Sequence, residues 1–511
     1  MLLPSQPLSC DLKFWTLTKK QRYKLKQQKL LYIQPLNRPW DESETKILQI
    51  PRAMFEVGYH IPAQHEISFL DLNLRTRQRP NWSVEQILAE VLENFQPDLI
   101  LLSFPTYAQG GQVKKILLAV KELKPRVKVI LGGGVLNLIG DAPQKLWCWP
   151  VDACYWGNGL QLAELVEAVL TTESSCFLFQ PDLEKELKTK LLDGYKAEDF
   201  YTSKGRFDFD GYLKEAREVE LTPIAFVEMA RSCDSFCNYC AFGIEASLRR
   251  CRKPGTVLKE IRYLAEKGID YILIIDPTFG MAKGAADFLL RELAAFHLEH
   301  PDVKFDVITR PEYVTEDFVR NLKAAGIVRC GVGMESMSQE SLDSLAKTSK
   351  PQMVRKAVRN LAAVGIETRL FHMLLPGKFS QETLEFLLQL AHENISFVVQ
   401  SSFLRPLPNS KSQDQFYTQD RTVFDRQQDT LEQLLEYLLI NLAFSSMDLD
   451  FEDSELRALI EKTFKEGKNL KTLFSQSREG GKLVLKISGY AFTESETYAP
   501  MEQCITKKQR G

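Results

Sequence analysis

Three cysteines lie close together near the middle of the chain, at Cys233, Cys237 and Cys240. Thiolates are soft ligands that suit iron–sulfur clusters and zinc, so three of them on one short segment can converge on a single metal centre. A structural zinc site is normally closed by four ligands, but the next cysteine along the chain is Cys251, in a basic stretch. The residues alone therefore leave two interpretations, an iron–sulfur centre with one open position and an incomplete zinc site.

The composition favours a reducing compartment. The 511 residues include ten cysteines, a much smaller share than the roughly 8–10% of disulfide scaffolds. The N-terminus lacks the pattern of a secretory signal, and no apolar run approaches the roughly 18 residues of a membrane helix. We therefore expect a cytoplasmic protein without a membrane span, in which thiols stay reduced. Basic residues number 65 and acidic residues 67, a net charge of -2, which argues against a nucleic-acid partner held by charge.

The elements that must position the cysteines form a regular series between residues 222 and 405. Short apolar runs predict strands at residues 224–228, 271–275, 305–309, 328–333, 368–375 and 397–403. Helical patterns separate them, at residues 257–267, 285–299, 316–325, 339–346, 353–364 and 381–391. Six parallel strands alternating with helices predict an α/β fold of the (βα)6 type, a partial TIM barrel. The cysteines directly follow the first strand, so the site is expected at the carboxyl ends of the strands.

A second α/β series precedes it, over residues 30–170. Apolar runs predict strands at residues 30–33, 67–72, 99–104, 127–131 and 152–155, with helices at 84–95, 113–123 and 160–170. This alternation predicts a doubly wound, Rossmann-like domain whose ligands lie outside the carboxyl ends of the strands.

Three further segments complete the domain prediction. Residues 1–29 are a polar N-terminal segment, and residues 171–221 are a connector that packs on its neighbours. Residues 406–511 are a mostly α-helical extension on the substrate side, with helices at 430–444 and 456–464 and a strand at 483–487.

The spacing C-x3-C-x2-C, directly after the first strand of a (βα)6-like series, resembles the radical SAM superfamily. The resemblance implies that Cys233, Cys237 and Cys240 hold a [4Fe–4S] cluster whose fourth iron binds S-adenosylmethionine (SAM). It further implies reductive cleavage of SAM to a 5′-deoxyadenosyl radical, with an external one-electron reductant of the flavodoxin or ferredoxin type. The cofactor then carries the difficult chemistry, and the protein positions it.

The resemblance also assigns candidate residues for SAM. Tyr239 stands where an aromatic residue packs near the adenine, or it packs within its own loop. Asp276 follows the second strand, where many members bind the SAM amino group, or it caps the next helix. Arg310, after the third strand, is a candidate partner for the SAM carboxylate, or forms a surface ion pair. Glu335 lies in the segment 331–336, which resembles the fourth-strand segment near the SAM ribose and methionine.

The order of the two series resembles the cobalamin-binding subclass of the same superfamily. The resemblance places the corrin against residues 103–107, with Ser103 and Thr106, and against residues 132–135, with Gly132, Gly133 and Gly134. Glycine would let the backbone approach the cofactor closely, although a tight strand-to-helix turn is an alternative explanation. Residues 157–160 depart from the run that members often carry, so a retained scaffold without cobalamin stays open.

Three functions follow from these resemblances. The leading hypothesis is a cobalamin-dependent methyltransferase acting on an unactivated carbon or a phosphinate phosphorus. The second is a maturase of a ribosomally made peptide, with the first domain as a scaffold. The third is a non-catalytic protein that binds a metal cluster. The expected partners are a small-molecule or peptide substrate, the external reductant and a small accessory protein.

Overall fold

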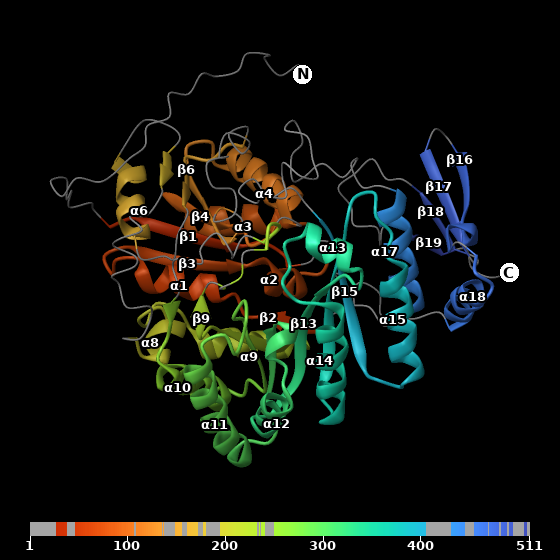
Figure 1. Ribbon diagram of the computed structural model, residues 1–511. Coiled ribbons are helices and arrows are strands. Elements are labelled where there is room, and N and C mark those ends of the chain that lie inside the picture. Colours follow the sequence, from red (N-terminus) through yellow and green to blue (C-terminus); the bar gives the residue numbers. More distant parts are fainter. Residues whose placement is uncertain are drawn as a thin grey trace. The chain divides into compact units, whose positions relative to one another are not determined.

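The computed structural model divides into two compact units, Met1–Ala225 and Phe226–Gly511, which are shown in Figure 1. The described residues are 27–37, 46–106, 109–134, 136, 149–155, 161–171, 177–179, 195–231, 233, 235, 237–240, 250–404, 431–444, 454–468, 470–479, 482–487, 490–493 and 505–507.

A six-stranded sheet forms the core of the first unit. Its order is β3-β1-β4-β5-β6-β7, and its neighbouring strands are parallel. The strands are β1 (Lys29–Gln34), β3 (Glu66–Asp71), β4 (Leu99–Ser103), β5 (Lys128–Gly132), β6 (Ala153–Tyr155) and β7 (Phe177–Phe179). Every residue of β4 is buried, as continuous apolar runs in parallel sheets require. The Rossmann-like prediction is confirmed, and β7 is an additional strand inside the predicted connector.

The helices of this unit are α1 (Arg52–His60), α2 (Leu72–Gln78), α3 (Val84–Phe95), α4 (Gly110–Leu123), α6 (Leu162–Thr171), α8 (Ala197–Tyr201) and α9 (Phe209–Glu218). Helix α3 begins and ends where the sequence predicts, because a capping box at Ser83 fixes its start. Helices α1, α2, α8 and α9 were not predicted. The connector helices pack on this unit: Phe209 of α9 lies edge-on to Phe55 of α1, with ring centroids 5.5 Å apart.

The second sheet has seven strands in the order β15-β14-β13-β12-β11-β8-β2. They are β2 (Ile47–Gln49), β8 (Thr222–Val227), β11 (Tyr271–Ile274), β12 (Lys304–Thr309), β13 (Ile327–Glu335), β14 (Glu367–Leu374) and β15 (Phe397–Phe403). All six predicted strands are present within two residues of their expected bounds. The seventh, β2, pairs in parallel with β8 and was missed because three residues give no readable period.

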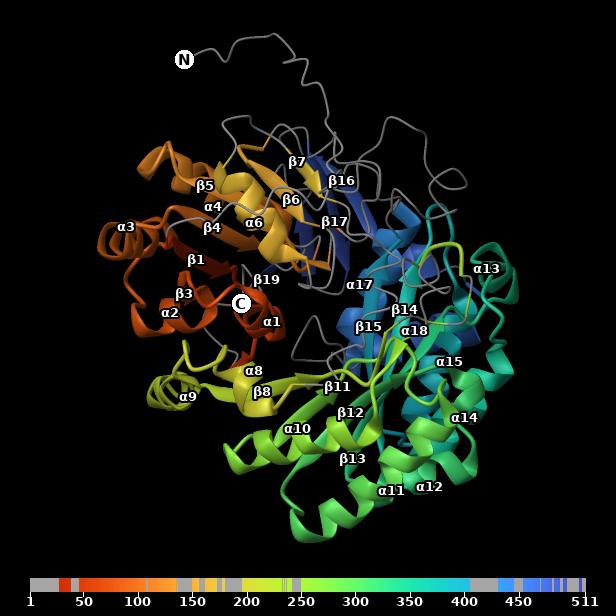
Figure 2. The ribbon, with the colours of Figure 1, turned by 90° about the vertical axis from the view of Figure 1, so that its left-hand side faces the viewer.

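Helices separate these strands as the sequence predicts (Figure 2). They are α10 (Pro254–Glu266), α11 (Lys283–Glu299), α12 (Glu316–Ala324), α13 (Gln339–Ser344), α14 (Pro351–Ala363) and α15 (Gln381–His392), with a 3-10 turn at Pro311–Tyr313. The strands β8 and β11–β15 therefore form the predicted partial barrel, with the chain segments that follow each strand gathered at the carboxyl ends.

The C-terminal part contains α17 (Leu431–Ala443), α18 (Ser454–Lys465) and a 3-10 turn at Leu470–Leu473. It also contains an antiparallel four-stranded sheet of β16 (Ser475–Glu479), β17 (Lys482–Ile487), β18 (Tyr490–Thr493) and β19 (Ile505–Lys507). The sequence predicted both helices but only β17 of this sheet. Among the helices built from described residues, none combines the length and apolar character that crossing a bilayer requires.

Candidate active site

Hydrogen bonds fix the start of the segment that carries the three cysteines. It begins after β8 and is closed by two short antiparallel strands, β9 (Ala230–Arg231) and β10 (Arg250–Cys251). One carboxylate oxygen of Asp276, Oδ1, accepts the backbone N–H groups of Met229, at 2.7 Å, and Ala230, at 2.9 Å. The end of β11 thereby fixes the position from which the cysteine segment starts.

Asp276 does not cap a helix. Helix α11 begins at Lys283 and its N-cap residue is Ala282, so the capping alternative is wrong. The Asp276 side chain is fully buried, and within the described residues its second oxygen, Oδ2, has no hydrogen-bond partner. Burial raises the pKa of Asp276 to about 7, against the opposing effect of the two N–H donors. A contact with the SAM amino group stays a prediction.

We expect the cost of charging Asp276 to appear as pH-dependent stability of the cofactor-free protein. The pKa of Asp276 is raised from 3.8 to about 7 in the folded protein. The stability that its protonated form contributes to the fold is therefore fully present below about pH 4 and is lost as the pH rises through 7. Each unit of pKa difference corresponds to about 1.4 kcal/mol. Asp276→Asn keeps an oxygen acceptor but cannot charge, so its denaturant stability relative to wild type should improve between pH 5 and 8. A constant difference across that range would contradict the assignment.

The thiols of the segment lie in different surroundings. Cys233 is buried, and its Sγ lies 3.3 Å from the hydroxyl oxygen of Thr278. Burial raises the pKa of the Cys237 thiol, while the positive charges of Lys347 and Arg310 act in the opposite direction. A raised pKa favours the protonated thiol in the metal-free protein, so metal binding must displace protons.

Arg310, at the end of β12, is buried rather than on the surface. Its guanidinium lies 2.5 Å from Glu312 Oε1 and also donates to the Thr348 hydroxyl. Its Nε, by contrast, has no hydrogen-bond partner within the described part of the chain. The ion pair expected as an alternative is present, between a buried guanidinium and the carboxylate of an exposed residue, and one donor is left over for a further carboxylate. That SAM supplies this carboxylate stays a prediction.

Glu335, the last residue of β13, lies in a buried ion pair. Lys347 Nζ is 3.0 Å from Glu335 Oε1, and burial together with the negative charge of Glu335 raises the pKa of Tyr239. The Tyr239 ring packs against Leu345, Leu375 and Leu404. Two predicted cofactor residues thus lie close together beside the cysteines. Contacts of Tyr239 and Glu335 with SAM stay predictions. Lys347 was missed because no sequence pattern marks it.

The chemistry of the donor set suits an iron–sulfur cluster. Thiolates are soft ligands of the kind that hold such clusters, and Cys233, Cys237 and Cys240 lie within one short segment. The positive charges of Lys347 and Arg310 favour the Cys237 thiolate, and the negative charge of Glu335 opposes it. The donor set and its electrostatics therefore suit the cluster.

The predicted corrin-facing residues lie together at the carboxyl edge of the first sheet. Ser103 pairs with Gly132 across β4 and β5, but its side chain is buried. Thr106 is exposed at this edge, and its hydroxyl donates to Gln109 at 3.1 Å. The other residues of this prediction, at 107, 135 and 157–160, lie outside the described residues.

Two of the three glycines at this edge have their own structural reasons. Gly133 has a φ of +125°, and a Cβ there would lie 2.5 Å from the backbone oxygen of Phe104. A Cβ on Gly134 would lie 3.1 Å from the backbone oxygen of Pro105. Gly132 is different, since a Cβ there would meet nothing closer than 3.9 Å. The tight turn therefore accounts for Gly133, whereas at Gly132 the described residues leave room for a Cβ.

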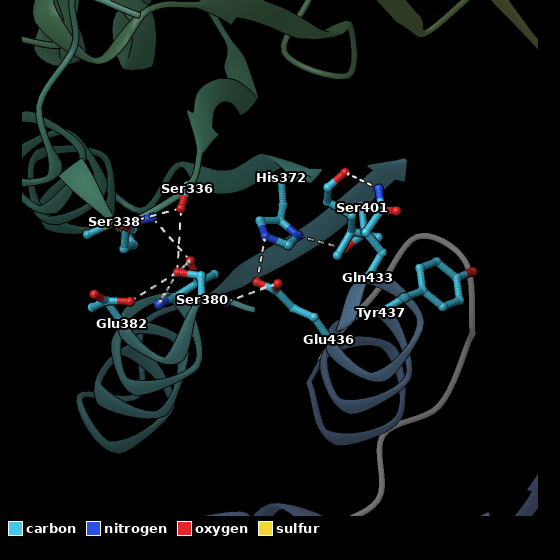
Figure 3. Close-up of polar contacts among 12 residues, drawn as sticks. Ser336, Ser338, His372, Ser380, Glu382, Ser401, Gln433, Glu436 and Tyr437 are labelled. Atoms are coloured by element: carbon cyan, nitrogen blue, oxygen red, sulfur yellow. Dashed lines mark hydrogen bonds and ion pairs between the residues drawn. The ribbon is translucent and has the colours of Figure 1, made fainter. Parts of the chain in front are cut away.

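A cluster of buried polar side chains connects the C-terminal helix α17 to the barrel (Figure 3). The sequence did not predict this cluster. His372 of β14 places Nε2 3.2 Å from Glu436 Oε1 and Nδ1 3.3 Å from the Ser401 hydroxyl. Glu436 Oε2 accepts the backbone N–H of Ser380 at 3.1 Å. Gln433 donates to the backbone oxygen at the end of β14, that of Leu374, at 2.7 Å. Helix α17 is therefore fixed to the segment between β14 and α15.

Glu436→Gln tests this connection. The substitution keeps an oxygen for the Ser380 N–H but removes the charge that faces His372. Hydrogen bonds to charged groups contribute about 1.5–3 kcal/mol, so the unfolding free energy should fall by about 2 kcal/mol. The matched control is Glu382→Gln: this exposed carboxylate also contacts Ser380, at 3.4 Å, and should change stability by less than about 0.5 kcal/mol. Equal effects in denaturant unfolding would argue against a special role for Glu436.

The comparison with protein families identifies the barrel. Residues 227–390 match the family model described as the radical SAM superfamily. This part of the chain belongs to the radical SAM superfamily. The family implies a [4Fe–4S] cluster and SAM, and the cysteine segment lies within the matched residues.

Curated relatives share only part of this chain. The ribosomal protein uS12 methylthiotransferase RimO of Clostridium botulinum is 31% identical over 149 residues, which are 26% of this chain and 32% of that protein. The corresponding RimO of Streptomyces coelicolor is 36% identical over 59 residues, 12% of each chain. The chain thus spans about a third or less of the length of these relatives.

Solved structures extend the similarity to most of the chain. The radical SAM methyltransferase TsrM of Kitasatospora setae, with tryptophan and a SAM analogue bound, aligns with a TM-score of 0.58 and 18% identity. It covers 76% of this chain and 75% of that chain. The cobalamin-dependent SAM radical enzyme OxsB, with aqua-cobalamin bound, aligns with a TM-score of 0.50 and 17% identity, over 87% of this chain and 62% of that chain. At these identities the likeness is one of fold.

Proposed function

We propose that the protein is a radical SAM enzyme in which Cys233, Cys237 and Cys240 hold a [4Fe–4S] cluster. The anchored cysteine segment at the end of β8, inside the residues that match the family, is the observation that carries this proposal. With SAM bound, the cluster supplies one-electron cleavage of SAM to a 5′-deoxyadenosyl radical, after reduction by a flavodoxin- or ferredoxin-type protein.

The residues around the cysteines have complementary tasks in this proposal. Asp276 holds the start of the cysteine segment through two backbone N–H groups. Arg310 offers its free Nε to the SAM carboxylate, and a fixed guanidinium suits that geometry. The pair of Glu335 and Lys347 adds a second charged contact beside Cys237. The external reductant brings the electron, and none of these residues changes oxidation state.

We further propose cobalamin-dependent methyl transfer to an unactivated carbon of a small molecule or peptide. Support comes from the fold likeness over most of the chain to a SAM methyltransferase and to a cobalamin-dependent enzyme. The room at Gly132, on the carboxyl edge of the first sheet, is where a flat cofactor can approach the backbone.

Anaerobic reconstitution tests both steps separately. The full chain is loaded with iron and sulfide and incubated with hydroxocobalamin, and unbound corrin is removed before absorbance is recorded. Corrin retained at about one per chain, together with reductant-dependent 5′-deoxyadenosine, is expected. Release of 5′-deoxyadenosine without retained corrin would reject cobalamin dependence and favour the peptide-maturase alternative. Absence of both would favour the non-catalytic alternative.

A further inference from the structure

The hydroxyl of Thr278 is placed against one of the three predicted cluster ligands. Its oxygen lies 3.3 Å from Cys233 Sγ, and only 3% of Thr278 and 9% of Cys233 are exposed. Either atom can donate while the cysteine is protonated. A thiolate that binds iron carries no hydrogen, so in the loaded protein the shared hydrogen must come from Thr278.

The backbone on both sides of Thr278 is held in place. Asp276 is fixed by the N–H groups of Met229 and Ala230. The N–H of Phe279 donates to the backbone oxygen of Ile308 at 2.7 Å. The backbone oxygen of Phe279 accepts a hydrogen bond from the Thr309 hydroxyl at 2.6 Å. The ring of Phe279 is fully buried. The hydroxyl is therefore preorganised, and a donor held in advance loses little freedom when it forms its bond.

We propose that Thr278 is a positioning residue that donates a hydrogen bond to the Cys233 thiolate and thereby raises the reduction potential of the cluster. The inference rests on the proposed function, because it takes Cys233 to be a cluster ligand. Hydrogen bonds to cluster sulfurs are one of the features that set reduction potentials. One-electron reduction adds negative charge that spreads onto the sulfurs, so a donor stabilises the reduced form more than the oxidised form.

Cys237 lies in surroundings that differ from those of Cys233. Its thiol is influenced by the charges of Lys347, Arg310 and Glu335, whereas Cys233 faces a neutral hydroxyl at hydrogen-bonding distance. The cluster would thus be tuned by cations on one ligand and by a hydroxyl on another.

The test compares Thr278→Val, which removes the hydroxyl at nearly constant volume, with Thr278→Ser, which keeps it. Each full-length variant is reconstituted anaerobically, its iron is counted, and its midpoint potential is measured by an EPR-monitored redox titration. We expect the valine variant to shift to a more negative potential. A loss of about tenfold in the reduction equilibrium corresponds to about 59 mV for one electron. The serine variant should keep the wild-type potential.

Two results would overturn the inference while leaving the proposed function intact. One is an unchanged potential in a valine variant with full iron, and the other is an equal shift in the serine and valine variants. If the valine variant takes up no cluster, Thr278→Ala replaces it, and an alanine potential equal to that of serine then rejects the inference. A wild-type protein that takes up no cluster would reject the proposed function itself, and the inference with it.

Discussion

Cys237→Ala is expected to lower the rate of SAM cleavage by more than about 100-fold. Loss of even an outer-shell partner of a metal site lowers metal affinity or activity by about 10–100-fold. With one thiol removed, two cysteines remain to hold a cluster that needs three protein ligands, so the reconstituted variant should lose most of its iron. Counting iron and sulfide per chain, together with the 5′-deoxyadenosine formed under reductant, measures both effects on one sample.

Two other cysteines provide matched controls. Cys251→Ala removes an exposed thiol eleven residues beyond Cys240, and it should keep the cluster and the activity. Cys330→Ala removes a fully buried thiol of β13, and it should lower stability without changing the iron content. If Cys251→Ala lost its metal together with Cys237→Ala, four thiols would hold the metal. That result would restore the zinc interpretation.

The elements that position the site are the part of the fold that local sequence rules predict best. The six barrel strands are largely apolar runs between helical patterns, with at least one face of each strand buried. The short strand β2 escaped because its three residues depend on pairing with β8, which no local pattern encodes. Of the C-terminal sheet, the sequence likewise predicted only the apolar strand β17.

The partners of the site residues were harder to predict, because they lie far apart along the chain. Asp276 bonds to a backbone 47 and 46 residues away, where a local rule suggested a helix cap. Thr278 meets Cys233 across 45 residues. The cysteine spacing marks the candidate ligands, but the side chains that surround them come from the barrel's long-range register. A single sequence does not show that register.

Substitutions in the glycine triplet can distinguish a glycine needed for folding from one that contacts a cofactor. Gly133→Ala is expected to lower the unfolding free energy by about 4 kcal/mol, in the range of severe backbone and packing defects. Its φ of +125° is one that L-residues rarely adopt, and the new Cβ would lie 2.5 Å from the Phe104 backbone, which cannot move aside as a side chain could. The Phe104 N–H also donates to the backbone oxygen of Gly132 at 2.6 Å, so this close approach is built into the sheet edge.

Gly132→Ala is the informative counterpart. A Cβ at Gly132 meets nothing closer than 3.9 Å, so stability should change by less than about 1 kcal/mol. If a corrin lies against this backbone, the same methyl group should weaken hydroxocobalamin binding by about tenfold, a cost of about 1.4 kcal/mol. Equilibrium dialysis and denaturant unfolding on the same preparation measure the two effects. Unchanged corrin affinity in a stable Gly132→Ala variant would remove Gly132 from the cofactor site and leave the triplet explained by the turn alone.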